Sequence, residues 1–114
     1  MKDKREYKDF INDIYKAILD IEIFIQGVSY NSFINDKEKV YAVVYSLLII
    51  GEAVKNIPEQ IKQQYSEIPW QKIAGMRNRL IHGYFTVDFD KVWETIIRDL
   101  PPLKQAINKI LSKM

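Results

Sequence analysis

The chain has 114 residues, of which 47% are hydrophobic and 28% are charged, and its formal net charge at pH 7 is +2. The length is typical of one domain, so we expect a single domain over residues 1–114, and the globular composition excludes disordered and collagen-like classes. The absence of cysteine excludes disulfides and cysteine-ligated zinc sites, which favours a reducing compartment. The small net charge does not indicate a nucleic-acid binder, although it permits a local basic patch.

Two stretches of the chain bear on where the protein resides. Residues 1–7 are too polar to begin a signal peptide. The most apolar stretch, residues 40–50, is interrupted by Ser46 and falls well short of the roughly 20 residues that a membrane-spanning helix needs. We therefore expect a cytoplasmic protein with no membrane contact.

The first predicted helix covers residues 7–28. Its apolar residues recur every three or four positions, which is typical of an amphipathic helix with one buried face. They are Tyr7, Phe10, Ile11, Ile14, Ile18, Ile21, Ile25 and Val28. Gly27 and the polar residues 29–36 then predict a loop.

The second predicted helix covers residues 36–57 and begins at a capping box formed by Asn35 and Glu38. Its apolar residues surround the whole circumference, so we expect burial on every side, with one side against another protein chain. They are Val40, Tyr41, Val43, Val44, Tyr45, Leu47, Leu48, Ile49 and Ile50. The same residues would suit a buried strand, but the length of the run favours a helix.

Proline and glycine delimit the next two segments. Pro58 ends or kinks the second helix, because it lacks a backbone donor and clashes with the preceding turn. Residues 59–65 are expected to add a short turn of helix. Pro69 fits the first position of a third helix, and Gly83 fits the residue just past its end.

Two further helices are expected before the end of the chain. Asp88 caps the fourth, which Pro101 and Pro102 break after Leu100, and a fifth helix follows. The elements together predict an all-α, up-and-down bundle of about five helices. Four aromatic residues are expected to lie in its core or at an interface rather than to stack on bases: Tyr41, Trp70, Phe89 and Trp93.

Residues 76–85 differ from the rest of the chain because they hold its only histidine. Arg77 precedes His82 by five positions, so the two side chains lie about 140° apart on an ideal helix. They can converge only where the helix ends or loosens, and Gly83 supplies such an end. A histidine at the C-terminal end of a helix lies at the negative pole of the dipole, which favours its protonated form.

These two residue types supply the chemistry that RNA cleavage by its own 2′-hydroxyl requires. Imidazole has an ordinary pKa of about 6.5 and exchanges protons near neutrality. The planar guanidinium of arginine can bind two phosphate oxygens and hold a developing negative charge. The residues alone leave three alternatives open: His82 as a structural cap, Arg77 in an ion pair with a carboxylate, and Arg79 as the functional arginine.

The pattern of Arg77, four residues, His82, one residue and Tyr84 resembles the Arg-x4-His-x-Tyr motif of HepT-like toxins in the HEPN superfamily. Segments similar to the family's own flank the motif in the same order and extend the resemblance over nearly the whole chain. They are residues 49–53 (IIGEA), 68–70 (IPW), 83–88 (GYFTVD), 92–93 (VW) and 99–101 (DLP).

The resemblance implies a HEPN-like fold and a metal-independent endoribonuclease that needs no cofactor. It also implies a type II- or VII-like toxin–antitoxin system, in which the antitoxin is a minimal nucleotidyltransferase (MNT). The active site of such proteins is a cleft for RNA at a homodimer interface. A two-fold axis would bring two copies of Arg77, Arg79 and His82 together, which would compensate for the small charge of one subunit.

The resemblance gives each motif residue a role. Arg77 grips the scissile phosphate, and His82 is the general acid or base. The motif does not specify Asn78, which we interpret either as orienting the phosphate or the imidazole or, equally, as bonding to backbone. Tyr84 receives adenosine monophosphate groups from the antitoxin, which would block the cleft and repel RNA, with packing by its ring as the alternative.

Glu52 is expected to support the site from the second helix. It follows a glycine in an otherwise apolar helix, so we expect a partly buried carboxylate that pairs with Arg77 or Arg79. A role in positioning arginine is favoured over a direct chemical role.

Two other functions are compatible with the sequence. The chain could be a non-catalytic, nucleotide- or partner-binding subunit of a nucleotidyltransferase complex, or a structural helical dimer without chemistry. No base-reading motif indicates which RNA is cut.

Overall fold

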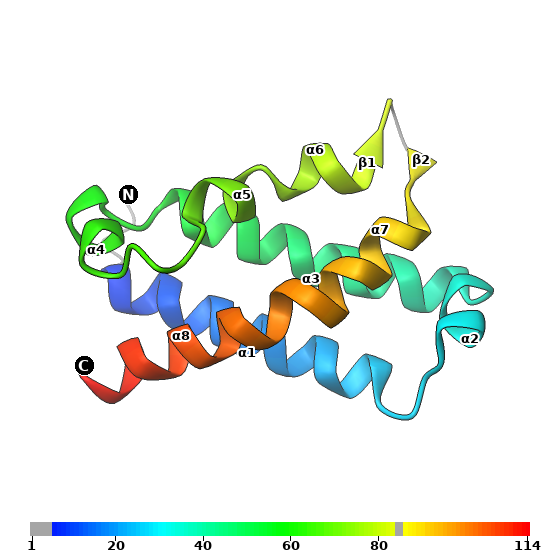
Figure 1. Cartoon of the computed structure of the whole chain (residues 1–114), viewed down its shortest axis with the longest axis horizontal. Coiled ribbons are helices and arrows are strands. Elements are labelled where there is room, and N and C mark those ends of the chain that lie inside the picture. The colour runs from blue at the N-terminus through cyan, green and yellow to red at the C-terminus, as the bar shows by residue number, and fades with distance from the viewer. Residues whose placement is uncertain (1–5, 84–85) are drawn as a thin grey trace, which may run out of the picture.

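The computed structural model describes residues 6–83 and 86–114, and this part of the chain is almost entirely helical (Figure 1). The two longest helices, α1 (Tyr7–Ile25) and α3 (Lys37–Lys55), lie side by side, and a third helical rod packs against both. The rod consists of α7 (Phe89–Glu94), η1 (Thr95–Asp99) and α8 (Leu100–Ser112). The predicted all-α class is confirmed.

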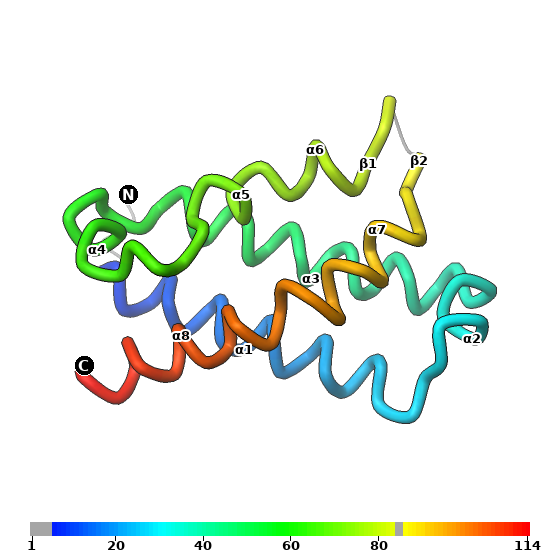
Figure 2. The backbone as a smooth tube through the Cα atoms, viewed as in Figure 1, coloured from blue at the N-terminus to red at the C-terminus, as the bar shows by residue number. Residues whose placement is uncertain are grey.

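The remaining elements lie at the two ends and along one side of this bundle. Figure 2 shows that α1 begins and α8 ends at the end that holds α4 (Glu59–Gln64), whereas α2 (Tyr30–Ile34) lies at the opposite end. A hairpin of β1 (Ile81–His82) and β2 (Thr86–Val87) projects near that opposite end. None of the helices in the described part of the chain is long and apolar enough to cross a membrane.

Helix α1 forms where the three-and-four spacing predicts it, and Ile11, Ile14, Ile18 and Ile21 are completely buried. A capping box closes its start, where the Glu6 backbone N–H donates to the Asp9 carboxylate at 3.0 Å. The helix ends at Ile25, three residues before the predicted boundary. These buried isoleucines form the α1 side of the core.

The predicted loop over residues 29–36 contains the short helix α2. The Ser29 hydroxyl accepts a hydrogen bond from the Ser32 backbone N–H at 3.1 Å, which caps it, and Phe33 is completely buried against the Trp93 ring. The predicted cap of the next helix is also wrong by one position. Asp36, rather than Asn35, accepts from the Lys39 N–H at 3.1 Å.

Helix α3 confirms the predicted helix and shows that the strand alternative is wrong. Within one chain, α3 is buried over only part of its circumference, and the expected contact of its other side with a second chain stays a prediction. Val40, Leu47 and Ile50 are in the core, but Tyr41 and Tyr45 are 46% and 67% exposed. An exposed strip therefore runs along α3.

The predicted third helix is two short helices, α5 (Trp70–Ala74) and α6 (Met76–Leu80), which meet at Gly75. Pro69 lies one position before the helix, at its N-cap, and not at the first helical residue. Helix α5 lies very close to α3, because a Cβ on Gly51 would be 3.3 Å from the carbonyl oxygen of Ile73. Helix α6 also packs on α3.

The expected extension of this helix to Gly83 is wrong. The helix ends at Leu80, and β1 pairs antiparallel with β2, with His82 opposite Thr86. The Leu80 carbonyl accepts a hydrogen bond from the Asp88 backbone N–H at 2.8 Å, so it does not bond to a following helical turn. Gly83 has φ +60°, which suits the turn that follows β1.

The predicted break at Pro101 and Pro102 is wrong as well. The chain passes from α7 through η1 into α8 without leaving the helix. η1 is a π-helical turn, in which the Leu100 N–H donates to the Thr95 carbonyl, five residues back. This wider turn directly precedes the two prolines, which lie in the first turn of α8.

Candidate active site

Helix α6 presents Arg77 and Asn78 to solvent. Met76 and Leu80 on the opposite side are buried, so they anchor the short helix in the core. Among the residues that the structure describes, the side chain of Arg77 has no ion-pair or hydrogen-bond partner, and the same holds for the side chain of Asn78, whose backbone N–H donates to the Gly75 carbonyl at 3.1 Å. The alternative of an intrachain ion pair for Arg77 is therefore not supported, and its guanidinium is available to an external anion.

His82 lies in β1, immediately after the helix that carries Arg77. Its side chain is 58% exposed, and Nε2 is 3.6 Å from Oδ2 of Asp88. The expected place for His82 at the last turn of a helix is wrong, because α6 ends at Leu80 and the backbone of Ile81 and His82 forms a strand. No hydrogen bond in the described part of the chain makes His82 a helix cap.

Arg79 has a different environment from Arg77. It is 3.5 Å from Oδ2 of Asp99, and Lys72 is 3.4 Å from Oδ1 of the same carboxylate. One acidic group on η1 thus holds two cations from α5 and α6. These ion pairs connect α5 and α6 to the rod of α7, η1 and α8, which indicates a structural role for Arg79.

The expectation for Glu52 is wrong within the chain. Its carboxylate is 72% exposed and forms an ion pair with Lys55 at 3.0 Å, not with Arg77 or Arg79. The reason is positional. Gly51 faces α5, and the next residue lies about 100° further round α3, on the exposed strip.

Tyr84, the predicted modification site, lies outside the described residues, as does Phe85. Among the described residues, no group of three or more histidine, cysteine, aspartate or glutamate side chains could hold a metal ion.

Of the four aromatic residues expected in the core or at an interface, Trp70 is buried and Trp93 packs on Phe33.

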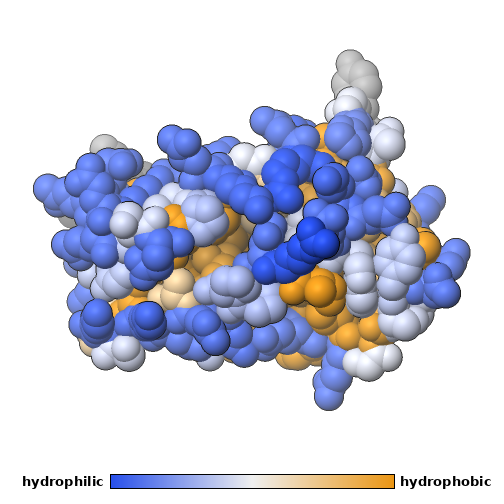
Figure 3. Space-filling model, in the orientation of Figure 1, coloured by the Kyte–Doolittle hydropathy of each residue, from blue (hydrophilic) through white to orange (hydrophobic). Residues whose placement is uncertain are grey.

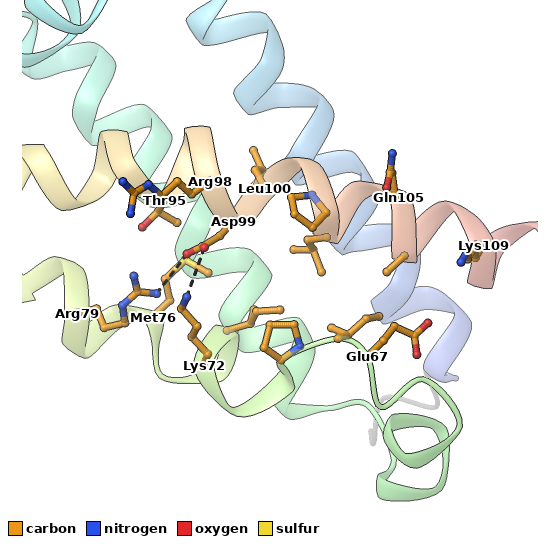
Figure 4. A pocket seen from close by; sticks show the side chains of 16 residues that line it. Glu67, Lys72, Met76, Arg79, Thr95, Arg98, Asp99, Leu100, Gln105 and Lys109 are labelled. Carbon is orange, nitrogen blue, oxygen red and sulfur yellow. Dashed lines mark hydrogen bonds and ion pairs between the residues drawn. The ribbon is translucent and has the colours of Figure 1, made fainter.

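A cavity of about 280 Å³ lies between α5 and α6 on one side and η1 and α8 on the other (Figure 4). Figure 3 shows hydrophobic surface at this place, surrounded by hydrophilic residues. Ile73, Met76 and Leu103 contribute to the apolar wall. The cationic groups around it are Lys72, Arg79, Arg98 and Lys109, against the acidic Glu67 and Asp99.

Sequence reasoning missed two carboxylates of this region. Asp88 was expected only as a helix cap, and Asp99 was not singled out. The sequence feature that could have indicated the contact of Asp88 with His82 is Gly83, because a chain reversal at this glycine brings the residues before it close to those after it. The pairing of Asp99 with Arg79 depends on tertiary packing, for which the chain offers no local pattern.

The comparisons with known proteins agree on one family. The family described as Ribonuclease HepT-like matches residues 14–110. The chain is 46% identical to a candidate RNase of Methanocaldococcus jannaschii over 95% of this chain and 89% of that protein. It is 45% identical to the probable ribonuclease HepT of Thermococcus cleftensis over 94% of this chain and 97% of that protein. No solved structure matches the chain.

A bacterial relative, a candidate RNase of Caldanaerobacter subterraneus, is 40% identical over 99% of this chain and 98% of its own length. The chain belongs to the HepT-like ribonuclease family. The predicted family is thus confirmed, and membership supports an enzyme of the HEPN ribonuclease type.

Proposed function

We propose that the chain is a metal-independent endoribonuclease and the toxin of a toxin–antitoxin pair, which acts on cytoplasmic RNA through Arg77 and His82. The observation that carries the proposal is an exposed arginine without an acidic partner among the described residues, on the helix that leads directly into the strand of an exposed histidine. Membership of the HepT-like ribonuclease family gives this pair its reaction class.

The reaction is an internal transfer of the phosphodiester. The 2′-oxygen bonds to phosphorus and the bond to the 5′-oxygen breaks, which leaves a cyclic phosphate on one product and a 5′-hydroxyl on the other. His82 accepts the 2′-hydroxyl proton, and a proton is returned to the leaving oxygen. Arg77 holds the non-bridging oxygens, where negative charge increases in the transition state.

The test is cleavage of RNA by protein purified free of antitoxin and of any modification at Tyr84, with a chelator present. We expect cyclic phosphate ends from the wild type and a loss of about 100-fold or more in kcat from His82→Ala or Arg77→Ala. Lys16→Ala, which removes an exposed cation from α1, is the matched control and should retain activity. If the unmodified wild type cuts no RNA, the proposal is wrong.

The proposed active unit is a homodimer formed through the exposed strip of α3. Tyr41, Tyr45 and Leu48 lie about 60° to 120° round the helix from Gly51, which faces α5. The strip therefore borders the side of α3 on which α5 and α6 pack. Tyrosine is enriched at interfaces, and a second copy on this strip would bring both α6 helices toward one cleft.

The dimer is tested by light scattering of the purified protein. We expect the mass of a dimer for the wild type and of a monomer for Tyr45→Glu, because a buried, unpaired carboxylate opposes association. Lys109→Glu, at an exposed position of α8, which packs on α1 and η1, changes charge without breaking the dimer. A wild type that remains monomeric at high concentration would contradict this part of the proposal.

The proposed partner is an antitoxin of the MNT type that adenylylates Tyr84. The support is family membership and the position of Tyr84, two residues after His82 in the sequence. An added phosphate carries negative charge and would repel RNA from the neighbouring imidazole. Co-expression with such a nucleotidyltransferase, followed by mass spectrometry, should show added adenylate that Tyr84→Phe abolishes. Its absence in an inactive complex would exclude this regulation.

The cavity beside α6 favours a second candidate function, a non-catalytic nucleotide-binding subunit. Its apolar wall suits a base, and Lys72, Arg98 and Lys109 suit a phosphate. Calorimetric titration with adenosine monophosphate is the test. Binding that Ala106→Trp abolishes and His82→Ala does not affect, in a protein without RNA cleavage, would favour this function.

A further inference from the structure

The carboxylate of Asp88 makes two different contacts with its two oxygens. Oδ1 accepts a hydrogen bond from the Lys91 backbone N–H at 3.0 Å and so caps α7. Oδ2 is 3.6 Å from Nε2 of His82. The Asp88 backbone N–H in addition donates to the Leu80 carbonyl at 2.8 Å. Two backbone hydrogen bonds therefore hold this carboxylate beside the chain's only histidine.

We propose that Asp88 is a positioning residue for His82. It orients the imidazole with Nε2 toward the carboxylate, which leaves Nδ1 for the RNA, and it stabilises the imidazolium that forms when His82 accepts the 2′-hydroxyl proton. The inference rests on the proposed function, because it assigns Asp88 a part in that reaction.

The contact is suited to act during the reaction rather than to stabilise the fold. The two side chains are 58% and 33% exposed, so water screens their attraction in the free protein. When RNA covers the hairpin and displaces this water, the same charge acts through a lower dielectric. Catalytic contacts are also often long in the free enzyme and shorten in the substrate complex.

Apart from Arg77, the charged groups on the elements that flank His82 have partners of their own. On α6, Arg79 pairs with Asp99. On α7, Lys91 is 3.9 Å from Glu94, and Asp90 accepts a hydrogen bond from the Tyr30 hydroxyl. Arg77 is the cation that the proposed reaction uses. Among the described residues, Asp88 is thus the acidic group that the structure sets against His82.

The test separates the charge of Asp88 from its capping hydrogen bond. Asp88→Asn keeps the cap, because asparagine caps helices about as well as aspartate does. Asp36→Asn is the matched control, since Asp36 caps α3 in the same way, with Oδ1 at 3.1 Å from the Lys39 N–H, and has no histidine beside it among the described residues. Asp88→Ser, which also caps, serves as the second variant if Asp88→Asn folds poorly.

We expect Asp88→Asn to lower kcat by about ten- to a hundredfold, because the imidazolium loses its counter-charge, while KM and the melting temperature change as little as in Asp36→Asn. A kcat equal to that of Asp36→Asn would overturn the inference. So would a loss of activity that only accompanies a loss of folded protein in both Asp88 variants.

A spectroscopic measurement tests the positioning without RNA. Because His82 is the only histidine, its ring nitrogens give one unambiguous pair of signals in nitrogen NMR. The wild type should hold its proton on Nε2 more fully than free histidine, and Asp88→Asn should move toward free histidine. An unchanged tautomer ratio would overturn the orientation by Asp88 even if cleavage is observed. Conversely, a wild type that shows this signature but cuts no RNA would refute the proposed function while the contact stands.

Discussion

Arg77 and Arg79 lie two residues apart on α6, and only Arg79 meets a carboxylate in the described part of the chain. Arg79 is 3.5 Å from Asp99 on η1, whereas Arg77 is exposed and unpaired there. Residues two apart on a helix point in nearly opposite directions, so one arginine faces the rod and the other faces solvent. The spacing of the motif and the tertiary contacts therefore both favour Arg77 as the arginine of the proposed reaction.

The two arginines should respond differently to removal. Arg77→Ala should lower kcat for RNA cleavage by about 100-fold or more, because a transition-state contact is lost. Arg79→Ala should lower kcat only a few-fold and lower the free energy of unfolding by up to about 1 kcal/mol, the usual range for a partly exposed ion pair. Cleavage kinetics and chemical denaturation of both variants give these values. Equal losses of kcat would contradict the division of roles.

The elements that were predictable from the sequence are those with a strong local pattern. Helix α1 follows from the spacing of its isoleucines, and the helix over residues 37–55 follows from the length of its apolar run. His82 drew attention because histidine occurs once in the chain, and the spacing of the family motif favoured Arg77 over Arg79. In each case the residues that form the pattern belong to the same segment whose structure or function they predict.

The features that were missed depend on contacts between segments. The helix ends at Leu80 because the backbone N–H of Asp88, which lies beyond the turn, donates a hydrogen bond to the Leu80 carbonyl. Glu52 is exposed because α5 packs on the neighbouring Gly51 rather than on the side that Glu52 occupies. The prolines after Leu100 do not end the rod because a π-helical turn precedes them. None of these contacts leaves a periodic pattern in the sequence.

The close approach of α5 to α3 predicts a large cost for a small side chain at Gly51. A Cβ there would be 3.3 Å from the Ile73 carbonyl oxygen, and both groups belong to backbone that cannot rotate away. Overpacking costs about 1–3 kcal/mol, and alanine is favoured over glycine inside a helix by up to about 1 kcal/mol, so Gly51→Ala should lower the free energy of unfolding by up to about 2 kcal/mol. Gly75→Ala is the matched control, because its Cβ would meet only carbonyl oxygens of the preceding turn, the nearer being that of Gln71 at 3.4 Å, and no atom of another helix. A Gly51→Ala variant as stable as Gly75→Ala would refute the close packing.

Tyr30 predicts a change in stability at high pH. Its hydroxyl donates to the Asp90 carboxylate, and this hydrogen bond, followed by desolvation and the charge of Asp90, raises the pKa of Tyr30 above its ordinary value. Below a pH of about 10 the tyrosine is protonated in both states, so its contribution to stability is complete. As the pH rises further, Tyr30 loses its proton in the unfolded chain before it does so in the folded protein. The stabilisation by this hydrogen bond therefore decreases from pH about 10 until the pH passes the raised pKa of Tyr30 in the folded protein.

Denaturation at several alkaline pH values checks this sign. The stability of the wild type should fall more steeply above pH about 10 than that of Tyr30→Phe, which has no proton to lose at this position. Asp90→Asn should bring the absorbance titration of Tyr30 closer to that of an ordinary tyrosine. Identical slopes for the wild type and Tyr30→Phe would show that the hydrogen bond does not form in solution.

The hairpin that carries His82 predicts that backbone strain at Gly83 affects catalysis. Gly83 and Gly27 have φ values of +60° and +72°, and a Cβ at either position would meet no atom within 4 Å. An alanine at either glycine should therefore cost about the same 1–2 kcal/mol of unfolding free energy, since the left-handed backbone alone opposes it. Gly83→Ala and Gly27→Ala therefore differ only in which residues lie next to the strained turn.

Gly27 follows α1, far along the chain from the motif, whereas Gly83 directly follows His82. Relief of the strain at Gly83 would shift β1 and move His82 away from Asp88. A misplacement of about 1 Å can cost about 100-fold in rate. Gly83→Ala should thus lose kcat while Gly27→Ala retains it at equal stability, which paired denaturation and cleavage assays would show. Equal activities in the two variants would mean that the exact path of the hairpin does not matter to the reaction.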